Sequence, residues 1–278
     1  MRLRFLGTGT SVGVPQIGCT CATCTSTDPR DRRRRTGCHV TAGDVAFVID
    51  TPPEFREACL QYGVSKVDAV LLSHCHMDHV AGFDDVRRFN TLNGTKVACA
   101  PDSPGANGRT WKIVGKPLNC YAAAETIADM RHVFPYVSTK PNAKGLFRPQ
   151  IVFKPVARAF RIGPVKVTPL DVPHGPKTYG FLLEEDGGGR IGWVSDCSAL
   201  PPKVVAKLKG VDAMVLDCLR ERPHPTHLSL EQSLAYALEI GAKKTWLIHM
   251  CHDVKHAEFE KLLPRGVRLS YDGLAIRA

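Results

Sequence analysis

The chain has 278 residues, of which 44% are apolar and 23% charged. These values are typical of a globular protein and exclude a disordered chain. Lys and Arg exceed Asp and Glu by 37 − 27 = 10, so the surface should attract phosphates or nucleic acid. No apolar run is long enough for a signal peptide or a membrane span. We therefore expect one cytoplasmic domain over 1–278, with no membrane partner.

Apolar runs bounded by glycine and proline predict strands, and longer amphipathic stretches predict helices. The predicted strands are 2–6, 45–49, 67–73, 96–100, 151–156, 165–170, 179–184, 190–195, 211–216 and 243–248. The predicted helices are 53–61, 79–91, 121–133, 201–208, 229–240 and 255–263. Strands that first cluster and then alternate with helices favour an α/β architecture of sheets covered outside by helices.

Two segments lack a regular pattern. Residues 101–150 are rich in glycine and proline and predict a loop-rich excursion, which either covers a site or is a passive insertion. Arg30 and Arg32–Arg35 form a basic cluster interrupted by Asp31. This cluster is interpreted either as a solvated loop or as a rim that attracts phosphate.

A predicted strand runs directly into four potential metal ligands, in the sequence Ser-His-Cys-His-Met-Asp-His over 73–79. Side chains two apart share a face of an extended chain, so His74 and His76 can converge on one ion. Asp78 and His79 can reach a second ion as the chain turns into a helix. So many polar groups are costly to cluster without a metal, which favours a metal site.

Three further candidates each follow a predicted strand, where loops collect functional groups: His174, Asp196 and His249. Each alone could equally be a cap or a buried core residue. Together with 73–79, they resemble the H-x-H-x-D-H motif and the later motifs of the metallo-β-lactamase superfamily, and Asp50 matches another of its motifs. The resemblance implies an αββα sandwich of two facing sheets with metals held in loops at one edge.

The same resemblance implies a set of roles. One ion would be held by His74, His76 and His174, the other by Asp78, His79 and His249, with Asp196 bridging the two. Asp50 would orient a ligand histidine by accepting its second N–H.

Cys19, Cys21 and Cys24 lie within six residues and predict a second site. Three thiols of a reduced protein are soft ligands for a structural zinc, and tetrahedral zinc needs a fourth ligand. His252 is the best fourth candidate, and Cys251 and Cys38 are its rivals. The other cysteines sit largely in apolar segments and are interpreted as buried thiols.

A two-metal motif combined with Cys-x-Cys-x-x-Cys and a distant histidine resembles the PhnP family of phosphodiesterases, which open phosphoribosyl 1,2-cyclic phosphate. Further matches are Arg33–Arg35, Thr178–Glu184, Ser195-Asp196, Asp217-Cys218 and Thr226-His227. Segment 101–150 is unlike that family and leaves the substrate open.

The resemblance implies a phosphodiesterase in which two ions activate a bridging water for attack on phosphorus. Asp78 is then part of the catalytic centre, and His227 would give a proton to the departing alkoxide. His227 could instead contact a substrate phosphate, and His224 could compete with it. Histidine and aspartate ligands suit manganese, zinc or iron.

Three other functions stay open. The net positive charge suits an RNA-processing nuclease of the RNase Z type. The second is hydrolysis of a thioester or a lactone, which the basic surface does not favour. The third is a non-catalytic, zinc-containing nucleic-acid-binding module, which would not need seven metal ligands. The expected partner is a small phosphodiester, with nucleic acid and a homodimer also open.

Overall fold

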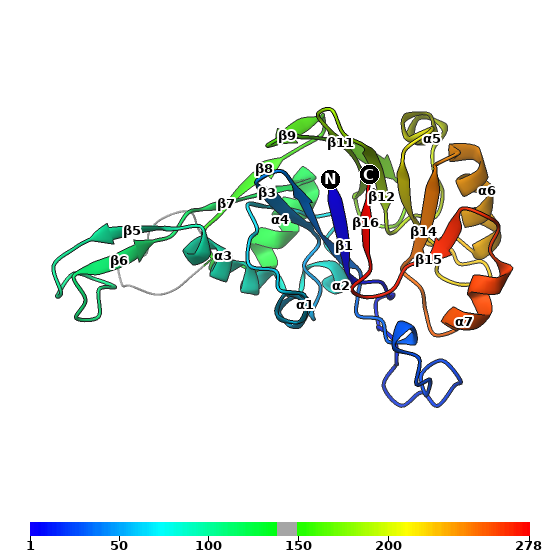
Figure 1. Ribbon diagram of the computed structural model, residues 1–278, viewed down its shortest axis with the longest axis horizontal. Helices are drawn as coiled ribbons and strands as arrows, with labels where there is room; N and C mark the ends of the chain where they lie inside the picture. Colours follow the sequence, from blue (N-terminus) through cyan, green and yellow to red (C-terminus); the bar gives the residue numbers. More distant parts are fainter. Residues whose placement is uncertain (138–148) are drawn as a thin grey trace.

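The computed structural model describes residues 1–137 and 149–278. Two mixed sheets face each other, with helices on their outer faces (Figure 1). In spatial order, the first sheet consists of β16 (Ala275–Arg277), β1 (Arg2–Gly7), β2 (Gly37–Ala42), β3 (Val45–Ile49), β4 (Ala69–Leu71), β7 (Leu118–Ala122) and β8 (Ile151–Pro155). The second consists of β15 (Val267–Leu269), β14 (Lys244–Ile248), β13 (Ala213–Asp217), β12 (Arg190–Val194), β11 (Thr178–Glu185), β10 (Val165–Val172) and β9 (Phe160–Ile162). The predicted αββα sandwich is confirmed.

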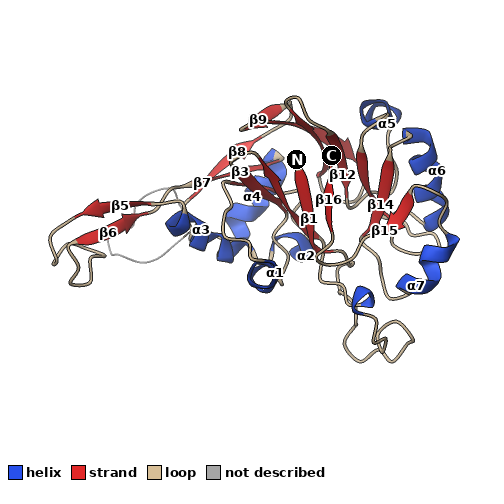
Figure 2. Ribbon diagram, in the orientation of Figure 1, coloured by secondary structure: helices blue, strands red, loops and turns tan. Residues whose placement is uncertain are grey.

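Helices cover the outer face of each sheet (Figure 2). Over the first sheet lie α1 (Phe55–Tyr62), α2 (Met77–Val80), the 3-10 helix η2 (Phe83–Val86), α3 (Arg87–Leu92) and α4 (Ala124–Val133). Over the second lie α5 (Pro202–Leu208), α6 (Leu230–Ile240), α7 (His256–Phe259) and the 3-10 helix η3 (Glu260–Leu262). A further 3-10 turn, η1 (Pro29–Asp31), lies in the loop after β1. Each sheet therefore has an outer apolar core beneath its helices.

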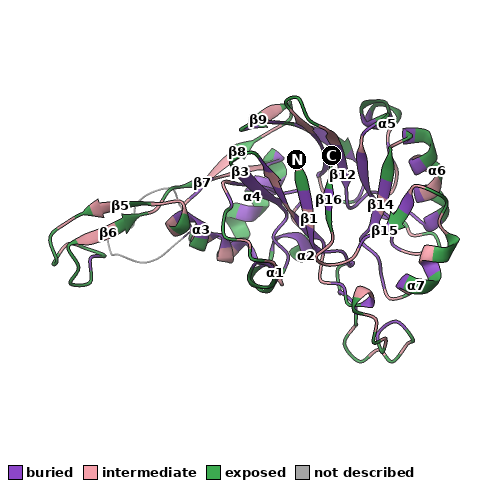
Figure 3. Ribbon diagram, in the orientation of Figure 1, coloured by how far each residue is buried: buried purple, intermediate pink, exposed green. Residues whose placement is uncertain are grey.

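The space between the sheets is filled by the inward side chains of both. Phe5 and Phe47 of the first sheet and Phe181 and Trp193 of the second are fully buried there (Figure 3). Alternation places every second residue of a strand on this face. Burying one such ring contributes about 1.5–3 kcal/mol, so this shared layer holds the sheets together.

Local signals set the helix ends. Ser229 caps α6 by accepting a hydrogen bond from the N–H of Gln232, whose side chain in turn accepts from the Ser229 N–H. Gly241 ends the helix with a φ of 62°, a left-handed conformation that glycine adopts without a steric penalty. This cap fixes the loop that precedes α6, which carries His227.

Parallel pairing places functional loops at one edge of the sandwich. β12, β13 and β14 run parallel to one another, as do β3, β4 and β7. Their carboxyl ends therefore meet at the same edge, between the sheets, where ligands of open α/β sheets generally bind.

Several predicted elements are corrected. The predicted helix 79–91 is broken into α2, η2 and α3. Gly82 lies at the first break, where a Cβ would be 2.2 Å from the carbonyl oxygen of Pro52, so glycine permits this close approach. The predicted helix 121–133 begins only at Ala124, because the preceding residues form β7 between β4 and β8. The predicted helix 255–263 is split into α7 and η3.

The prediction of a loop-rich excursion over 101–150 is wrong for much of its length. The segment contains β6 (Trp111–Val114), the core strand β7 and helix α4. β6 pairs with β5 (Thr95–Ala98) in a hairpin that projects from the body of the molecule (Figure 1). Residues 138–148 of this prediction lie outside the described residues. In the described residues, no helix is long and apolar enough to cross a membrane.

Candidate metal centre

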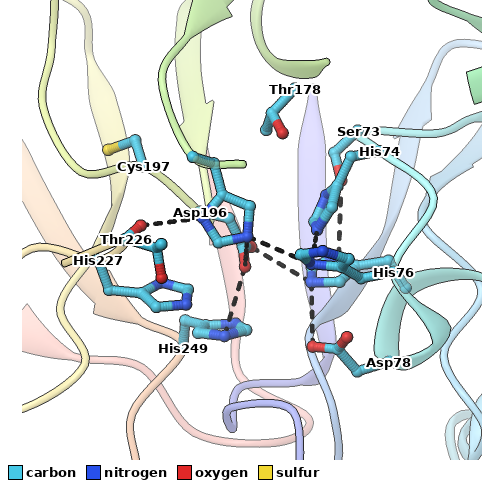
Figure 4. Close-up of polar contacts among 12 residues, drawn as sticks. Ser73, His74, His76, Asp78, Thr178, Asp196, Cys197, Thr226, His227 and His249 are labelled. Carbon is cyan, nitrogen blue, oxygen red and sulfur yellow. Dashed lines mark hydrogen bonds and ion pairs between the residues drawn. The ribbon is translucent and has the colours of Figure 1, made fainter. Parts of the chain in front are cut away.

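The seven residues predicted to hold the two ions lie in loops and a short helix that follow strands, on the edge where the sheets meet. Five of them are labelled in Figure 4: His74, His76, Asp78, Asp196 and His249. His74 and His76 follow β4, and α2 then carries Asp78 and His79. The remaining three follow β10, β12 and β14: His174, Asp196 and His249. The fold thus brings together residues from 74 to 249 of the sequence.

Three histidines converge on one point. Nε2 of His74 lies 3.0 Å from Nδ1 of His76, and Nε2 of His174 lies 3.3 Å from that same nitrogen. Two nitrogens bound to one tetrahedral zinc at about 2.0–2.1 Å would be roughly 3.3 Å apart. The spacing of this group therefore fits one divalent ion.

A second group lies beside the first. Asp78, His79 and His249 form it, with Oδ2 of Asp78 3.3 Å from Nε2 of His79. Asp196 lies between the groups: Oδ1 is 3.3 Å from Nε2 of His79, and Oδ2 is 3.8 Å from Nε2 of His174. Nε2 of His79 and Oδ1 of Asp196 are buried, and neither has a hydrogen-bond partner among residues 1–137 and 149–278. Buried polar atoms are normally satisfied, so these two atoms fit a cation between the groups.

Each of four histidines is anchored through its Nδ1. Nδ1–H of His174 donates to the carbonyl of Thr226 at 2.9 Å, and that of His249 to the Thr36 hydroxyl at 3.1 Å. His74 donates to the Ser73 hydroxyl, and His79 to the Asp50 carboxylate, at 2.9 and 2.8 Å respectively. Such anchors fix which ring nitrogen faces the centre, here Nε2 in all four.

Asp50 is placed as its predicted role requires. It is fully buried and accepts hydrogen bonds from the Ser73 N–H, the Ser73 hydroxyl and His79 Nδ1. Its φ of 62° and that of His249, 65°, are unusual for residues other than glycine. Such backbone strain clusters at functional sites.

Burial keeps most of the ligand rings neutral. It lowers the pKa of His249 to about 3 and holds the pKa of His74 well below its usual range, so both keep a lone pair for an ion. Burial also opposes charging of His79, but the surrounding carboxylates of Asp196, Asp50 and Asp78 outweigh it and raise its pKa well above the usual value. An ion at this position would displace that proton.

His227 lies at the rim of the centre, with its ring stacked on that of His249 at a centroid distance of 4.7 Å. Its Nδ1 lies 3.0 Å from Oδ2 of Asp217, a fully buried carboxylate at the end of β13. Burial lowers the pKa of His227, but Asp217 outweighs this effect and the pKa is raised. The rival His224 lies farther out and accepts from the Thr226 N–H at 3.3 Å.

The roles of Asp217, Thr36 and Ser73 are not evident from the sequence. Asp217 entered only as part of a matching dipeptide, although its place after a buried strand is the same signal that singled out Asp196. Thr36 and Ser73 carried no signal, because their contacts with His249 and His74 exist only in the folded chain.

The predicted cysteine site also comes together. The Sγ atoms of Cys19, Cys21 and Cys24 lie 3.2, 3.6 and 3.7 Å from Nδ1 of His252. A tetrahedral zinc would hold sulfur and nitrogen ligands roughly 3.6 Å apart. Of the two rivals, Cys38 lies in the core between the sheets, and within the described part of the chain only His252 groups with the three thiols.

The basic cluster after this site is largely paired with carboxylates. The ion pairs are Arg30–Asp28, Arg33–Asp31, Arg34–Asp272 and Arg35–Glu54. Arg33 is buried and also donates to the carbonyl of Cys251 at 3.3 Å. These arginines therefore hold the loop to the body of the molecule, and few of their charges are free for a phosphate.

The family model described as beta-lactamase superfamily domain matches residues 46–250, which include every predicted ligand of the metal centre. This chain belongs to the beta-lactamase superfamily. The two-sheet architecture and the histidine-aspartate clusters are those of a metal-dependent hydrolase of the metallo-β-lactamase fold.

Solved structures of the superfamily align along the whole chain. A diphosphatase from the PhnP family is 35% identical with a TM-score of 0.83, covering 100% of this chain and 97% of that one. Zinc-bound PqqB from Methylobacterium extorquens is 18% identical with a TM-score of 0.77, and both chains are covered completely. The short form of human tRNase Z is 14% identical with a TM-score of 0.64, covering 99% and 98%. The predicted likeness to the PhnP family is confirmed, whereas the other two show the fold alone.

Two curated relatives are similar in sequence to most of this chain. An octanoyltransferase of Porphyromonas gingivalis is 30% identical over 99% of this chain and 51% of that protein. The chain thus spans about half the length of that relative. Coenzyme PQQ synthesis protein B of Methylobacterium nodulans is 26% identical over 78% of this chain and 72% of its own.

Proposed function

We propose that this protein hydrolyses a small phosphodiester, with phosphoribosyl 1,2-cyclic phosphate as the candidate substrate. The observation that carries the proposal is the arrangement around Asp196: two ligand groups share this buried carboxylate, and His227 stands at their rim with Asp217 behind it. The likeness to a PhnP-family diphosphatase supports chemistry at phosphorus.

In this proposal, two divalent ions of manganese, zinc or iron occupy the centre. His74, His76 and His174 would hold one, and Asp78, His79 and His249 the other, with Asp196 reaching both. When bound, the ions would lower the pKa of a water and neutralise charge on the phosphoryl oxygens. A structural zinc would be held by Cys19, Cys21, Cys24 and His252.

Residues of the chain itself would hold and transfer the proton of the reaction. Because Nδ1 of His227 donates to Asp217, the ring directs Nε2 away from that carboxylate and can hold a second proton there. Asp217 raises the pKa of His227 and so favours the protonated ring, and His227 delivers this proton to the departing alkoxide. Asp217 stabilises the charged ring of His227 and fixes its orientation, whereas Asp50 fixes the orientation of the His79 ring.

The surroundings of the centre suit a small anionic substrate. A groove of 490 Å³ lies beside His174 and is bordered by Lys177, Thr178 and Ser198. This volume lies within the range of small-molecule sites. We also propose the cytoplasm as the location, because a zinc site of three cysteines needs reduced thiols.

The test is hydrolysis of 5-phosphoribosyl 1,2-cyclic phosphate by metal-loaded protein, followed by phosphorus NMR. Conversion of the cyclic signal to an acyclic monoester supports the proposal. Asp78→Asn should lose most of the rate, since it removes a charged member of the second group. Asp186→Asn is the matched control, because this exposed carboxylate pairs with Arg161 and lies on the turn after β11, at the end of that strand away from the centre. An unchanged ring with fully metallated protein would exclude this substrate.

The same samples discriminate the alternatives. The diphosphatase likeness favours cleavage of a diphosphate linkage as the second candidate. Because of the likeness to tRNase Z, a structured RNA is also tested as a substrate. Because of the octanoyltransferase relative, an octanoyl thioester is tested as well. Turnover of one of these with no turnover of the cyclic diester would replace the proposed substrate. Sedimentation of the same protein tests the homodimer.

A further inference from the structure

A small cavity on the outer face of the first sheet is lined mainly by cationic and polar side chains. Its volume is 120 Å³. It lies beside the carboxyl end of α1, which ends at Tyr62. Its lining residues are Arg2, Arg4, His39, Thr41, Tyr62, Gly63 and Val64.

Strand register explains why the cations meet here. Arg4 stands opposite His39, and Arg2 opposite Thr41, in the antiparallel β1–β2 pair. On its other side, Arg2 stands opposite Arg277 of β16. The residues that alternate with these on β1, β2 and β16 are buried between the sheets, so the cationic set faces outward. Like charges directly opposite each other destabilise a sheet, so the pairing of Arg2 with Arg277 should lower the stability of this edge of the sheet.

Arg2, Arg4 and Arg277 make no ion pair with a carboxylate of the described residues. This contrasts with the loop arginines after the cysteine site, four of which have such a partner. Arg4 does lie 5.7 Å from the ring centre of Tyr62. However, Arg34 occupies the same ring at 5.8 Å, and an aromatic face offers no formal negative charge.

The pKa of His39 reflects the positive charge around the cavity. Its Nε2–H donates to the carbonyl of Lys66 at 3.1 Å, so Nδ1 is the ring nitrogen that this hydrogen bond does not use. Burial lowers the pKa of His39, and the charges of Arg4 and Arg2 lower it further. An anion in the cavity would offset these cations.

We propose that this cavity binds a phosphate group, either inorganic phosphate or the terminal phosphate of a small phosphomonoester. Arg2 and Arg4 supply charge-assisted hydrogen bonds in a planar geometry that suits phosphate. Thr41 adds a neutral hydroxyl donor to the lining. The volume admits one such group and little more.

The site is separate from the metal centre. Gly9, just beyond the carboxyl end of β1, bridges to Met250 next to the ligand loop of His249. Arg2 is at the opposite end of β1 (Figure 1), roughly 20 Å away at the rise of an extended strand. One small substrate cannot reach both sites, so the inference does not depend on the proposed reaction.

The test is an NMR titration of zinc-loaded protein with inorganic phosphate, read at the imidazole of His39. This local signal separates the cavity from phosphate bound at the metals. We expect a saturable shift, about tenfold weaker affinity in the variant that combines Arg2→Ala with Arg4→Ala, and unchanged affinity in Arg158→Ala. Arg158 is a matched control because it is another exposed arginine, on the loop between β8 and β9.

Thr41→Val, which keeps both cations, should weaken binding less than the double variant and provides a second measurement if that variant is poorly folded. Glycerol 3-phosphate, titrated in parallel, distinguishes the two sources: tighter binding than inorganic phosphate assigns a phosphomonoester, and weaker binding assigns free phosphate. The proposal is overturned if the His39 signal does not saturate, if chloride at equal ionic strength reproduces the shift, or if the double variant binds as the wild type does.

Discussion

Asp217 and His227 act as one unit at the metal centre. Nδ1 of His227 is tied to a carboxylate that is fully buried and that also accepts the N–H groups of Cys197 and Leu228. An imidazole held in this way has one orientation and one nitrogen left for the substrate. In the proposed reaction, Asp217 is therefore a positioning residue, and His227 is the group that would contact the substrate.

We expect Asp217→Asn to lower kcat on an unactivated diester by about 10²–10⁴-fold, the range of a general acid, with little change in KM. Because Asp217 raises the pKa of His227, the wild-type rate should fall as the pH rises through that raised pKa, and in Asp217→Asn the fall should occur at lower pH. The measurement is a kcat profile against pH.

A bis(p-nitrophenyl) phosphate assay is the control, since its leaving group needs no proton and both Asp217→Asn and His227→Ala should keep most of the rate. The double variant should be no slower than the worse single variant, because the two residues share one function. Full turnover of an unactivated diester by His227→Ala would contradict the assignment.

At the residue scale, sequence alone identified what lies together in the chain. His74, His76, Asp78 and His79 lie within six residues, and alternation along a strand already implies that two of them share a face. Asp217 could not be assigned in this way, because its meaning depends on His227, ten residues away on the far side of a turn. Tertiary neighbours, which no spacing reveals, decide such roles.

Helix α7 is an element whose stability should depend on pH. It begins at His256, which is buried and whose N–H donates to Asp31 at 2.7 Å. Burial lowers the pKa of His256 to about 4, and the charges of Arg30 and Arg33 add to this effect. The unfolded chain, with a pKa near 6.5, therefore takes up a proton before the folded chain does.

Stability at α7 is thus fully present above about pH 6.5 and is lost as the pH falls toward 4, by up to roughly 2–3 kcal/mol. His256→Gln should remove this part of the dependence, seen as a flatter plot of the urea midpoint between pH 7 and 4. His132→Gln is the control, because this exposed histidine lies on α4. Equal slopes for wild type and His256→Gln would contradict the expectation.

At the element scale, sequence predicted strands best where both faces are apolar. β3 was predicted with its observed bounds, because Val45–Ile49 is apolar throughout. β2, whose sequence is Gly-Cys-His-Val-Thr-Ala, was missed, since its outer residues are polar and its pattern is short. The short edge strands β15 and β16 were missed for the same reason, as three residues show no period.

Across the whole molecule, the cysteine site joins two distant parts of the chain. The loop after β1 carries Cys19, Cys21 and Cys24, and His252 follows the ligand loop of β14. The same two segments meet through Gly9, which bridges to Met250. A zinc at this site would therefore brace the loop that presents His249 to the metal centre.

We expect Cys24→Ser to lower the zinc content by one ion per chain and Tm by about 5 °C or more, since about 2 kcal/mol corresponds to that shift in a chain of this size. The fold itself should persist, because the core between the sheets contains none of the four ligands. Activity should also fall, mainly through kcat and less through KM, because His249 would lose its fixed position without the zinc. Cys99→Ser is the control, as Cys99 lies in the hairpin loop beyond β5, away from this site. A Cys24→Ser protein with unchanged zinc content by elemental analysis and unchanged Tm would show that these thiols hold no structural ion.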